Sequence, residues 1–319
     1  MEGVERTYQQ VAAFVDGLVA AGVRHACASP GSRSSPLALL LGRHPAIRMW
    51  MHLDERSSGY FALGLAKVSR EPVAILCTSG TAAANLLPAV VEARYGRVPL
   101  VVITADRPPE LRDAGAPQTI DQLRLYGPHA KWFVDVPVFG GREPDERYAH
   151  AVASRAVTTA RTSPAGPVHL NFPFREPLVP APGAIPAFGA ATTSHQPAVP
   201  SPRPPDADAI GRIAAELRDA TRGLIVCGPQ DDPDLPAAMA GLARATGFPV
   251  LADPLSLARC GSHDRGLVVD AYDALLRDTP TRGALEPQVV LRVGAPPTSK
   301  ALMSYLAEHP GARQVQVAG

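Results

Sequence analysis

The sequence contains little cysteine and no excess of either charge, and each of these features disfavours a class of protein. Its four cysteines are spread over 319 residues without a CxxC pair, which argues against a disulfide framework and against a zinc site. A formal net charge of +1 gives no electrostatic basis for binding nucleic acid or an anionic membrane. No HxxxH or paired-acid spacing is present, so we expect no metal ligands within this chain.

The sequence also has no apolar run long enough to span a membrane. Its first residues form an amphipathic helical pattern rather than a signal peptide, which predicts a cytoplasmic protein. Apolar residues make up 46% and charged residues 19% of the chain, as in ordinary globular proteins. Because 319 residues exceed the size that one hydrophobic core usually serves, we expect two domains.

Two stretches of alternating strand and helix patterns make up most of the sequence. In the first stretch, the predicted strands are 23–28, 47–53, 73–77 and 100–104, and the predicted helices are 11–19, 36–41, 57–67 and 82–93. The strands are short, continuous apolar runs. This pattern is typical of a parallel sheet that is covered by helices on both faces.

A second stretch of the same kind follows a segment rich in proline, alanine and serine. Its predicted strands are 223–228, 249–252, 289–293 and 314–318, and its predicted helices are 235–246, 268–276 and 299–308. The sequence therefore predicts an α/β fold with two doubly wound parallel-sheet domains, at 1–176 and 206–319, joined by a linker at 177–205. We expect the second domain to be truncated, because it ends on an entering strand.

Polar segments follow the four predicted strands of the first domain. They are SPGSR at 29–33, DER at 54–56, TSGT at 78–81 and DRPPE at 106–110. In parallel sheets, ligands bind where the strands deliver their carboxyl ends. We therefore expect these segments to gather at one edge of the sheet, with the lone acid Glu55 held against a heterocyclic ligand.

Each of these segments also has a purely structural explanation. An acid in the first turn of a helix, such as Glu55, is stabilised by the helix dipole, and the segment at 29–33, taken in isolation, is better explained as a tight turn with a serine cap. The segment at 78–81 resembles an anion cradle but lacks the lysine of a Walker loop. A surface salt-bridge cluster would account for 106–110. In the second domain, Lys300 begins a predicted helix, where the dipole disfavours a cation, so we expect an anionic partner for it.

Taken together, the motifs resemble those of the thiamine diphosphate-dependent enzymes. Within that family they are most similar to the 2-succinyl-5-enolpyruvyl-6-hydroxy-3-cyclohexene-1-carboxylate synthases of menaquinone biosynthesis. The resemblance rests on SPGSRSSPLAL, HLDERSSGYFALGLAK, CTSGTAAANLLPAVVEA, PLVVITADRPPELRDAGAPQTIDQ and VLRVGAPPTSK. Several long motifs in the same order form a far more specific signal than a single glycine fingerprint.

The resemblance implies a fold of three α/β domains, of which the pyrimidine-binding and central domains cover this chain. The third domain would carry the ligands of the diphosphate and of Mg²⁺ or Mn²⁺, and we find no matching segment here. It also implies a homodimer, because such enzymes place the cofactor between two subunits. The predicted helices at 57–67 and 82–93 are candidates for that interface.

The resemblance also assigns roles to particular residues. Glu55 would be catalytic, with its carboxylate hydrogen-bonded to N1′ of the cofactor's aminopyrimidine. The cofactor-binding residues would be Glu55, Thr78, Ser79 and Gly80, and the substrate-binding residues would be Ser32, Arg33, Arg107, Gln118 and Lys300. The implied reaction is decarboxylation of 2-oxoglutarate followed by addition of the succinyl carbanion to isochorismate. Both substrates are polyanions, which matches the cationic side chains.

Three other interpretations of the sequence remain open. A different thiamine carboligase, such as a relative of acetolactate synthase, would share the role of Glu55 but use a neutral acceptor. A non-catalytic remnant would bind a ligand or partner without turnover, and the unmatched third domain favours it. A nucleotide-binding α/β protein is the third, and only the glycine loops support it.

Overall fold

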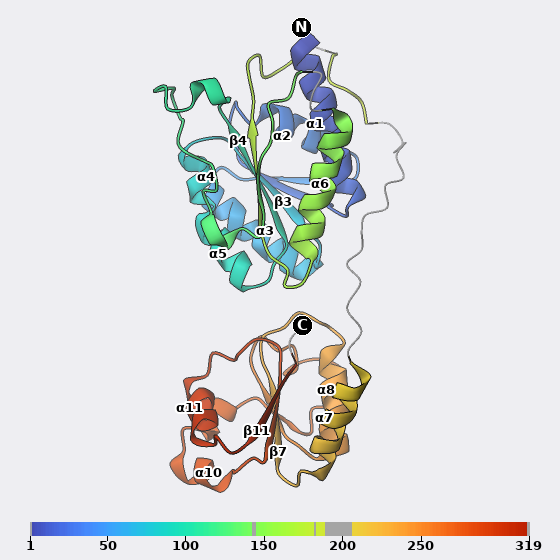
Figure 1. The fold of residues 1–319 in the computed structure, drawn as a ribbon, viewed down its shortest axis with the longest axis vertical. Coiled ribbons are helices and arrows are strands. Elements are labelled where there is room, and N and C mark those ends of the chain that lie inside the picture. The colour runs from blue at the N-terminus through green and yellow to red at the C-terminus, as the bar shows by residue number, and fades with distance from the viewer. Residues whose placement is uncertain (1, 142–144, 182, 189–205, 318–319) are drawn as a thin grey trace. The chain divides into compact units, whose positions relative to one another are not determined.

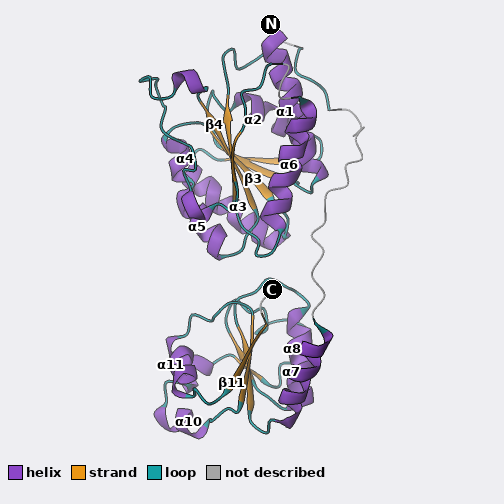
Figure 2. Cartoon of the chain, in the orientation of Figure 1, coloured by secondary structure: helices purple, strands orange, loops and turns teal. Residues whose placement is uncertain are grey.

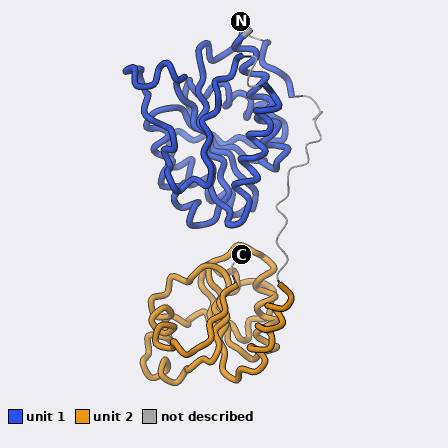
Figure 3. Tube along the Cα trace, viewed as in Figure 1, with its two compact units in different colours: residues 1–201 blue, residues 202–319 orange. Residues whose placement is uncertain are grey.

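The computed structural model describes residues 2–141, 145–181, 183–188 and 206–317 (Figure 1). The chain divides into two compact units, residues 1–201 and 202–319 (Figure 3). Each unit is a parallel sheet between layers of helices, so the predicted α/β fold with two parallel-sheet domains is confirmed (Figure 2). Most of the predicted linker, from 189 to 205, lies outside the described residues. No helix in the described ranges is both long and apolar enough to cross a membrane.

The sheet of the first unit has six parallel strands in the order β2-β1-β3-β4-β6-β5. The strands are β1 (His25–Ala28), β2 (Arg48–Met51), β3 (Val73–Cys77), β4 (Leu100–Asp106), β5 (Phe133–Asp135) and β6 (Val168–Pro173). Strands β3, β4 and β6 are buried along their whole length, which explains their unbroken apolar character.

Helices cover both faces of this sheet, and alternate strand residues point to opposite faces. One face packs against α1 (Glu2–Ala20), α2 (Ser35–Arg43) and α6 (Glu146–Arg161), with α1 and α6 side by side (Figure 1). The other face packs against α3 (Glu55–Ser69), α4 (Thr81–Asn85) and α5 (Leu87–Tyr95). Two short 3₁₀ turns, Pro109–Leu111 and Gly127–His129, complete the unit.

The helix predicted at 82–93 is divided in two, which corrects the sequence prediction. Helix α4 ends before Leu86 and α5 begins after it, with a proline in the first turn of α5. Pro88 has no N–H to donate to the carbonyl four residues earlier, and its ring crowds that carbonyl. A local apolar pattern continues across the break, which is why the sequence suggests a single helix.

The second unit has five parallel strands in the order β11-β10-β7-β8-β9. They are β7 (Gly223–Cys227), β8 (Val250–Ala252), β9 (Val268–Val269), β10 (Val289–Val293) and β11 (Arg313–Val317). Helices α7 (Ala207–Asp219) and α8 (Leu235–Thr246) pack on one face. Helices α9 (Tyr272–Leu275) and α11 (Lys300–Glu308) pack on the other, and α10 (Thr279–Ala284) lies between them in the chain.

The helix predicted at 268–276 is wrong for its first half. Val268 and Val269 form β9, which pairs with Val250 and Leu251 of β8 at the edge of the sheet. Only residues 272–275 are helical. Two β-branched residues in succession fit a pleated strand, and the pairing with β8 decides between strand and helix.

Candidate active site

The loops that follow β1, β2, β3 and β4 meet at one edge of the first sheet, because these four strands are neighbours in it. The contact between the first and third loops is close. A Cβ atom on Gly31 would lie 2.3 Å from Cβ of Thr78, so only glycine fits there. The prediction that the four polar segments lie at one edge of the sheet is therefore confirmed.

Glu55 is the first residue of α3, and it is half-buried. The side chain of Asp54 caps the helix by accepting a hydrogen bond from the backbone N–H of Ser57, at 2.7 Å. The cap leaves the Glu55 carboxylate free for other contacts. Its Oε2 accepts a hydrogen bond from Nδ2 of Asn85, the last residue of α4, at 3.2 Å. Burial, with a smaller contribution from the charge of Glu55, raises the pKa of Cys77, which places the carboxylate near the end of β3.

Asn85 has no assigned role in the sequence prediction. A polar residue at the end of the apolar segment TAAAN was the available signal, but an asparagine at a helix end is common for local reasons. Only the packing of α4 beside α3 shows that it contacts Glu55.

The loop at 78–81 is held in place by glutamines from the segment that follows β4. Thr78 and Ser79 are buried, and Gly80 has a φ of +81°, a conformation that glycine adopts without strain. The backbone N–H of Gly80 donates to Oε1 of Gln122 at 2.8 Å. The Ser79 hydroxyl donates to the carbonyl oxygen of Gln118 at 3.1 Å, and Nε2 of Gln118 donates to the carbonyl oxygen of Ser79 at 3.1 Å.

Arg33 and Ser32 lie next to each other in the first loop but in different environments. Ser32 is exposed, whereas Arg33 is 6% exposed. Nη1 of Arg33 donates to the carbonyl oxygen of Phe174 at 2.9 Å, and Nη2 forms an ion pair with Oε1 of Glu176 at 3.1 Å. Its Nε is buried and has no partner among the described residues.

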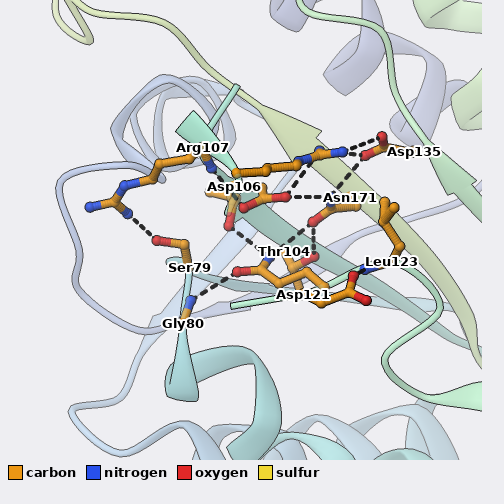
Figure 4. Close-up of polar contacts among 12 residues, drawn as sticks. Ser79, Gly80, Thr104, Asp106, Arg107, Asp121, Leu123, Asp135 and Asn171 are labelled. Atoms are coloured by element: carbon orange, nitrogen blue, oxygen red, sulfur yellow. Dashed lines mark hydrogen bonds and ion pairs between the residues drawn. The ribbon is translucent and has the colours of Figure 1, made fainter. Parts of the chain in front are cut away.

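Arg107 extends from the end of β4 towards the third loop, and its guanidinium donates to the hydroxyl of Ser79 (Figure 4). Burial lowers its pKa, and the positive charge of Arg33 lowers it further, against the opposing charges of Asp106 and Glu176. Arg33 and Arg107 therefore lie close enough to repel each other. Two like charges at a sheet edge form an anion-binding arrangement.

A buried network around Asn171 lies beside these loops and is bonded to them (Figure 4). Oδ1 of Asn171 accepts hydrogen bonds from Thr104 at 2.8 Å and from Nε2 of Gln122 at 2.9 Å. Nδ2 of Asn171 donates to Asp106 and to Asp135, both at 2.8 Å. All four hydrogen-bonding positions of the amide are filled, so its orientation is fixed.

Asp106 links this network to the anion-binding arrangement. Its Oδ1 accepts the backbone N–H of Arg107 at 2.7 Å, and its Oδ2 pairs with Nη2 of Arg112 at 3.0 Å. Arg112 also binds Asp135 through both Nη atoms. Burial raises the pKa of Asp106, while its hydrogen bond from Asn171 and the charge of Arg112 oppose that shift.

The sequence prediction assigned no site role to the residues of this network. They are Asp106, Arg112, Gln122, Asp135 and Asn171. Asp106 and Gln122 lie within the motif PLVVITADRPPELRDAGAPQTIDQ, but Asp135 and Asn171 are separate from it in sequence. They reach the network because Asp135, Asn171 and Thr104 stand opposite one another on β5, β6 and β4.

Lys300 belongs to the second unit, where it is exposed at the first position of α11. It has no ion-pair partner within the described parts of the chain, so the anionic partner expected from the helix dipole is not found there. Ser299 caps the helix by accepting the backbone N–H of Leu302, at 3.1 Å. A role of Lys300 beside the first-unit residues stays a prediction.

The first-unit residues fit the pyrimidine part of thiamine diphosphate. Oε1 of Glu55 has no hydrogen-bond partner within the described ranges and is available to a ring nitrogen. Two buried hydroxyls also lack partners there, that of Ser58, one turn along α3, and that of Ser29, which follows β1. In the described parts of the chain, no cluster of three or more histidine, cysteine, aspartate or glutamate side chains is placed to hold a metal ion.

Comparison with known proteins bears on the same region. Residues 9–125 match the family described as thiamine pyrophosphate enzyme, N-terminal TPP binding domain. This range includes Glu55, Asn85, the loop at 78–81 and both arginines of the anion-binding arrangement.

Similarity to individual proteins extends over nearly the whole chain. The sequence is 54% identical over 307 residues to the 2-succinyl-5-enolpyruvyl-6-hydroxy-3-cyclohexene-1-carboxylate synthase of Geobacillus kaustophilus, covering 96% of this chain and 53% of that protein. It is 50% identical to the synthase of the same name from Chloroflexus aurantiacus, covering 99% of this chain and 54% of that one. The chain spans about half the length of the curated relatives it matches. These matches confirm the resemblance seen in the motifs: residues 9–125 are similar to the N-terminal domain of thiamine pyrophosphate enzymes, and the chain is similar to about half the length of these synthases.

Proposed function

We propose that this chain supplies the pyrimidine-binding side of a thiamine diphosphate-dependent synthase of menaquinone biosynthesis. The reaction is decarboxylation of 2-oxoglutarate and transfer of the succinyl group to isochorismate, giving 2-succinyl-5-enolpyruvyl-6-hydroxy-3-cyclohexene-1-carboxylate. One observation carries the proposal. The Glu55 carboxylate, held by Asn85, lies at the same sheet edge as the paired cations Arg33 and Arg107.

The residues of the first unit divide between cofactor and substrates. Bound thiamine diphosphate supplies an electron sink for the decarboxylation. The Glu55 carboxylate accepts a hydrogen bond from N1′ of the pyrimidine ring and keeps the proton at that nitrogen. Its Oε2 is fixed by the hydrogen bond from Asn85. The loop formed by Thr78, Ser79 and Gly80 flanks the ring.

Arg33 and Arg107 bind carboxylates of the polyanionic substrates, and Ser32 and Gln118 orient them through neutral hydrogen bonds. The support for this assignment is electrostatic, since each guanidinium lies at an edge where an added carboxylate relieves the repulsion between them. Lys300, in the second unit, is proposed as a further substrate-binding cation.

The proposal extends to the rest of the assembly. Residues 1–176 form the pyrimidine-binding domain and 206–319 the central domain, and Mg²⁺ or Mn²⁺ is bound with the diphosphate by the part of the relatives' length that this chain does not span. The active unit is a homodimer in the cytoplasm. The exposed apolar side chains of Tyr60 and Phe61 on α3 and of Leu87 on α5 support an interface on these helices.

The test measures carbon dioxide release from labelled 2-oxoglutarate, with isochorismate, thiamine diphosphate and Mg²⁺ present. The chain is assayed alone and after addition of the C-terminal half of a related synthase. Release in the mixture, together with formation of the succinylated product, supports the proposal. Release with pyruvate and a neutral acceptor would instead favour another carboligase. If the chain is folded by circular dichroism but releases no carbon dioxide, either alone or with the added C-terminal half, the result would favour a non-catalytic binding protein.

A further inference from the structure

The Arg33 side chain already has a carboxylate bound to it. Its guanidinium pairs with Glu176 at 3.1 Å, and the two side chains differ sharply in exposure, at 8% for Arg33 and 73% for Glu176. The carboxylate therefore reaches the buried guanidinium from the solvent side. This is the side from which a dissolved anion would approach.

Glu176 also acts on the second arginine. Its negative charge raises the pKa of Arg107, against the lowering caused by burial and by the charge of Arg33. One carboxylate thus partly compensates two guanidinium groups. When the carboxylate leaves, both cations face an incoming ligand without it.

The backbone beside Glu176 is anchored, while its own side chain is not. The backbone N–H of Phe174 donates to the carbonyl oxygen of Asp106 at 3.1 Å, which continues the pairing of β6 with β4. Arg175 forms an ion pair with Glu110 in the loop after β4. Within the described ranges, the Glu176 side chain has Arg33 as its only hydrogen-bonded partner, so rotation of its side chain breaks a single contact.

We propose that Glu176 is a resident anion, whose carboxylate occupies the position of a substrate carboxylate on Arg33 and is displaced when that substrate binds. The inference rests on the proposed function in that the displacing ligand is a dicarboxylate. It makes Glu176 a specificity-determining residue. An incoming anion must outcompete an internal carboxylate, so a ligand that engages Arg33 and Arg107 together is favoured over one that engages Arg33 alone.

The experiment measures dissociation constants of malonate and 2-oxoglutarate for the full chain by calorimetric titration in low-chloride buffer. Glu176→Gln keeps the shape of the side chain and removes its charge. We expect it to bind both anions about threefold to tenfold more tightly than wild type, the change appropriate to loss of one partly exposed, hydrogen-bonded competitor. Glu176→Ala, which removes the side chain, should show the same direction.

Glu110→Gln is the matched control. It removes the same charge from the neighbouring ion pair with Arg175, which does not contact Arg33. Its dissociation constants should equal those of wild type, and a similar tightening in it would reduce the effect to overall charge and overturn the proposal. Equal or weaker binding by Glu176→Gln would also overturn it, showing that Glu176 positions Arg33 for the ligand. Absence of binding by every variant would overturn it as well, since Glu176→Gln leaves both guanidiniums without the charge of Glu176.

The outcome is separable from that of the proposed function. Tighter malonate and 2-oxoglutarate binding by Glu176→Gln, without carbon dioxide release in the reconstituted mixture, would retain the resident anion and discard the synthase reaction. Release of carbon dioxide without tighter binding would retain the synthase reaction and discard the resident anion.

Discussion

The two sheets of this protein have the same architecture, but their strands end in different ways. In the first unit, the loops at the carboxyl edge place Glu55, Arg33 and Arg107 where they can meet a ligand. In the second unit, the loops after β7 and β10 close against each other through backbone. The N–H of Ala295, after β10, donates to the carbonyl oxygen of Pro229, after β7, at 2.9 Å. The comparison shows that both units have the same sheet edge, and that the side chains of the loops at that edge determine whether it can bind a ligand.

The strongest test of the difference is removal of the first unit's carboxylate. Glu55→Gln should slow exchange of the thiazolium C2 proton of bound thiamine diphosphate by about 100-fold to 10,000-fold, the range for loss of a positioned acid–base group. Exchange is followed by proton NMR in the mixture with the C-terminal half of a related synthase. Glu92→Gln on the exposed surface of α5 is the control. Exchange at the wild-type rate in Glu55→Gln would remove Glu55 from the mechanism.

The buried network is tested next, through its effect on stability at neutral pH. Asn171→Ala deletes four hydrogen bonds inside a buried network, one each to Thr104, Gln122, Asp106 and Asp135, so we expect a loss of about 3 kcal/mol or more in the free energy of unfolding. Urea unfolding is followed by tryptophan fluorescence. Both tryptophans, Trp50 and Trp132, lie in the first unit, so the signal reports that unit alone.

A loss below about 1 kcal/mol in Asn171→Ala would mean that the network contributes little, on the scale of a single net hydrogen bond. Gln230→Ala in the second unit is the control, because its Nε2 makes one hydrogen bond, to the carbonyl oxygen of Ser256, in a partly exposed setting. The tryptophan signal should not change in that variant.

The backbone closure of the second unit is tested at Gly228. A Cβ atom there would lie 1.8 Å from the carbonyl oxygen of Ala295, so Gly228→Ala should destabilise the second unit by about 2 kcal/mol, as overpacking does elsewhere. Gly241 in α8 has nothing within 4 Å of its added Cβ. Gly241→Ala should therefore stabilise the same unit by about 0.5–1 kcal/mol. Differential scanning calorimetry compares the two, and a Gly228→Ala protein as stable as wild type would contradict the closure.

His169 gives a pH dependence of stability that is confined to the first unit and absent at neutral pH. Burial lowers its pKa to about 3, with the charge of Asp135 opposing that shift. The unfolded chain therefore binds a proton first. The stabilisation is complete above about pH 6.5 and is lost as the pH falls towards 3, at about 1.4 kcal/mol per pH unit from this residue.

The measurement is the free energy of unfolding against pH, again by tryptophan fluorescence. His169→Gln keeps an amide donor for Thr104 and removes the titrating ring, so its curve should be flatter by that slope. An unchanged slope would show that other groups account for the acid sensitivity.

The sequence predicts the sheet layers because buried strands and amphipathic helices leave local patterns. It also predicts the gathering of 29–33, 54–56, 78–81 and 106–110, since carboxyl ends of parallel strands share an edge. The network could not be predicted in this way. Asp135 and Asn171 reach it through strand pairing over a long sequence separation, and a single sequence carries no record of that register. The break at Leu86 and the strand at 268–269 were missed because proline geometry and edge pairing outweigh a local helical pattern.

The fixed orientation of the Asn171 amide has a consequence for how this protein can change over time. Each of its two ends is bound by groups of opposite hydrogen-bonding character, donors on one side and carboxylates on the other. Aspartate at position 171 would place a third negative charge beside those of Asp106 and Asp135. A hydrophobic residue there would leave both carboxylates without their hydrogen bond from the amide. Substitution at this position is therefore tolerated only if Asp106, Asp135 and Gln122 change with it. We expect these four positions to change only together and therefore to diverge slowly among relatives. This should hold even though only Asp106 is next to a residue proposed to contact a substrate.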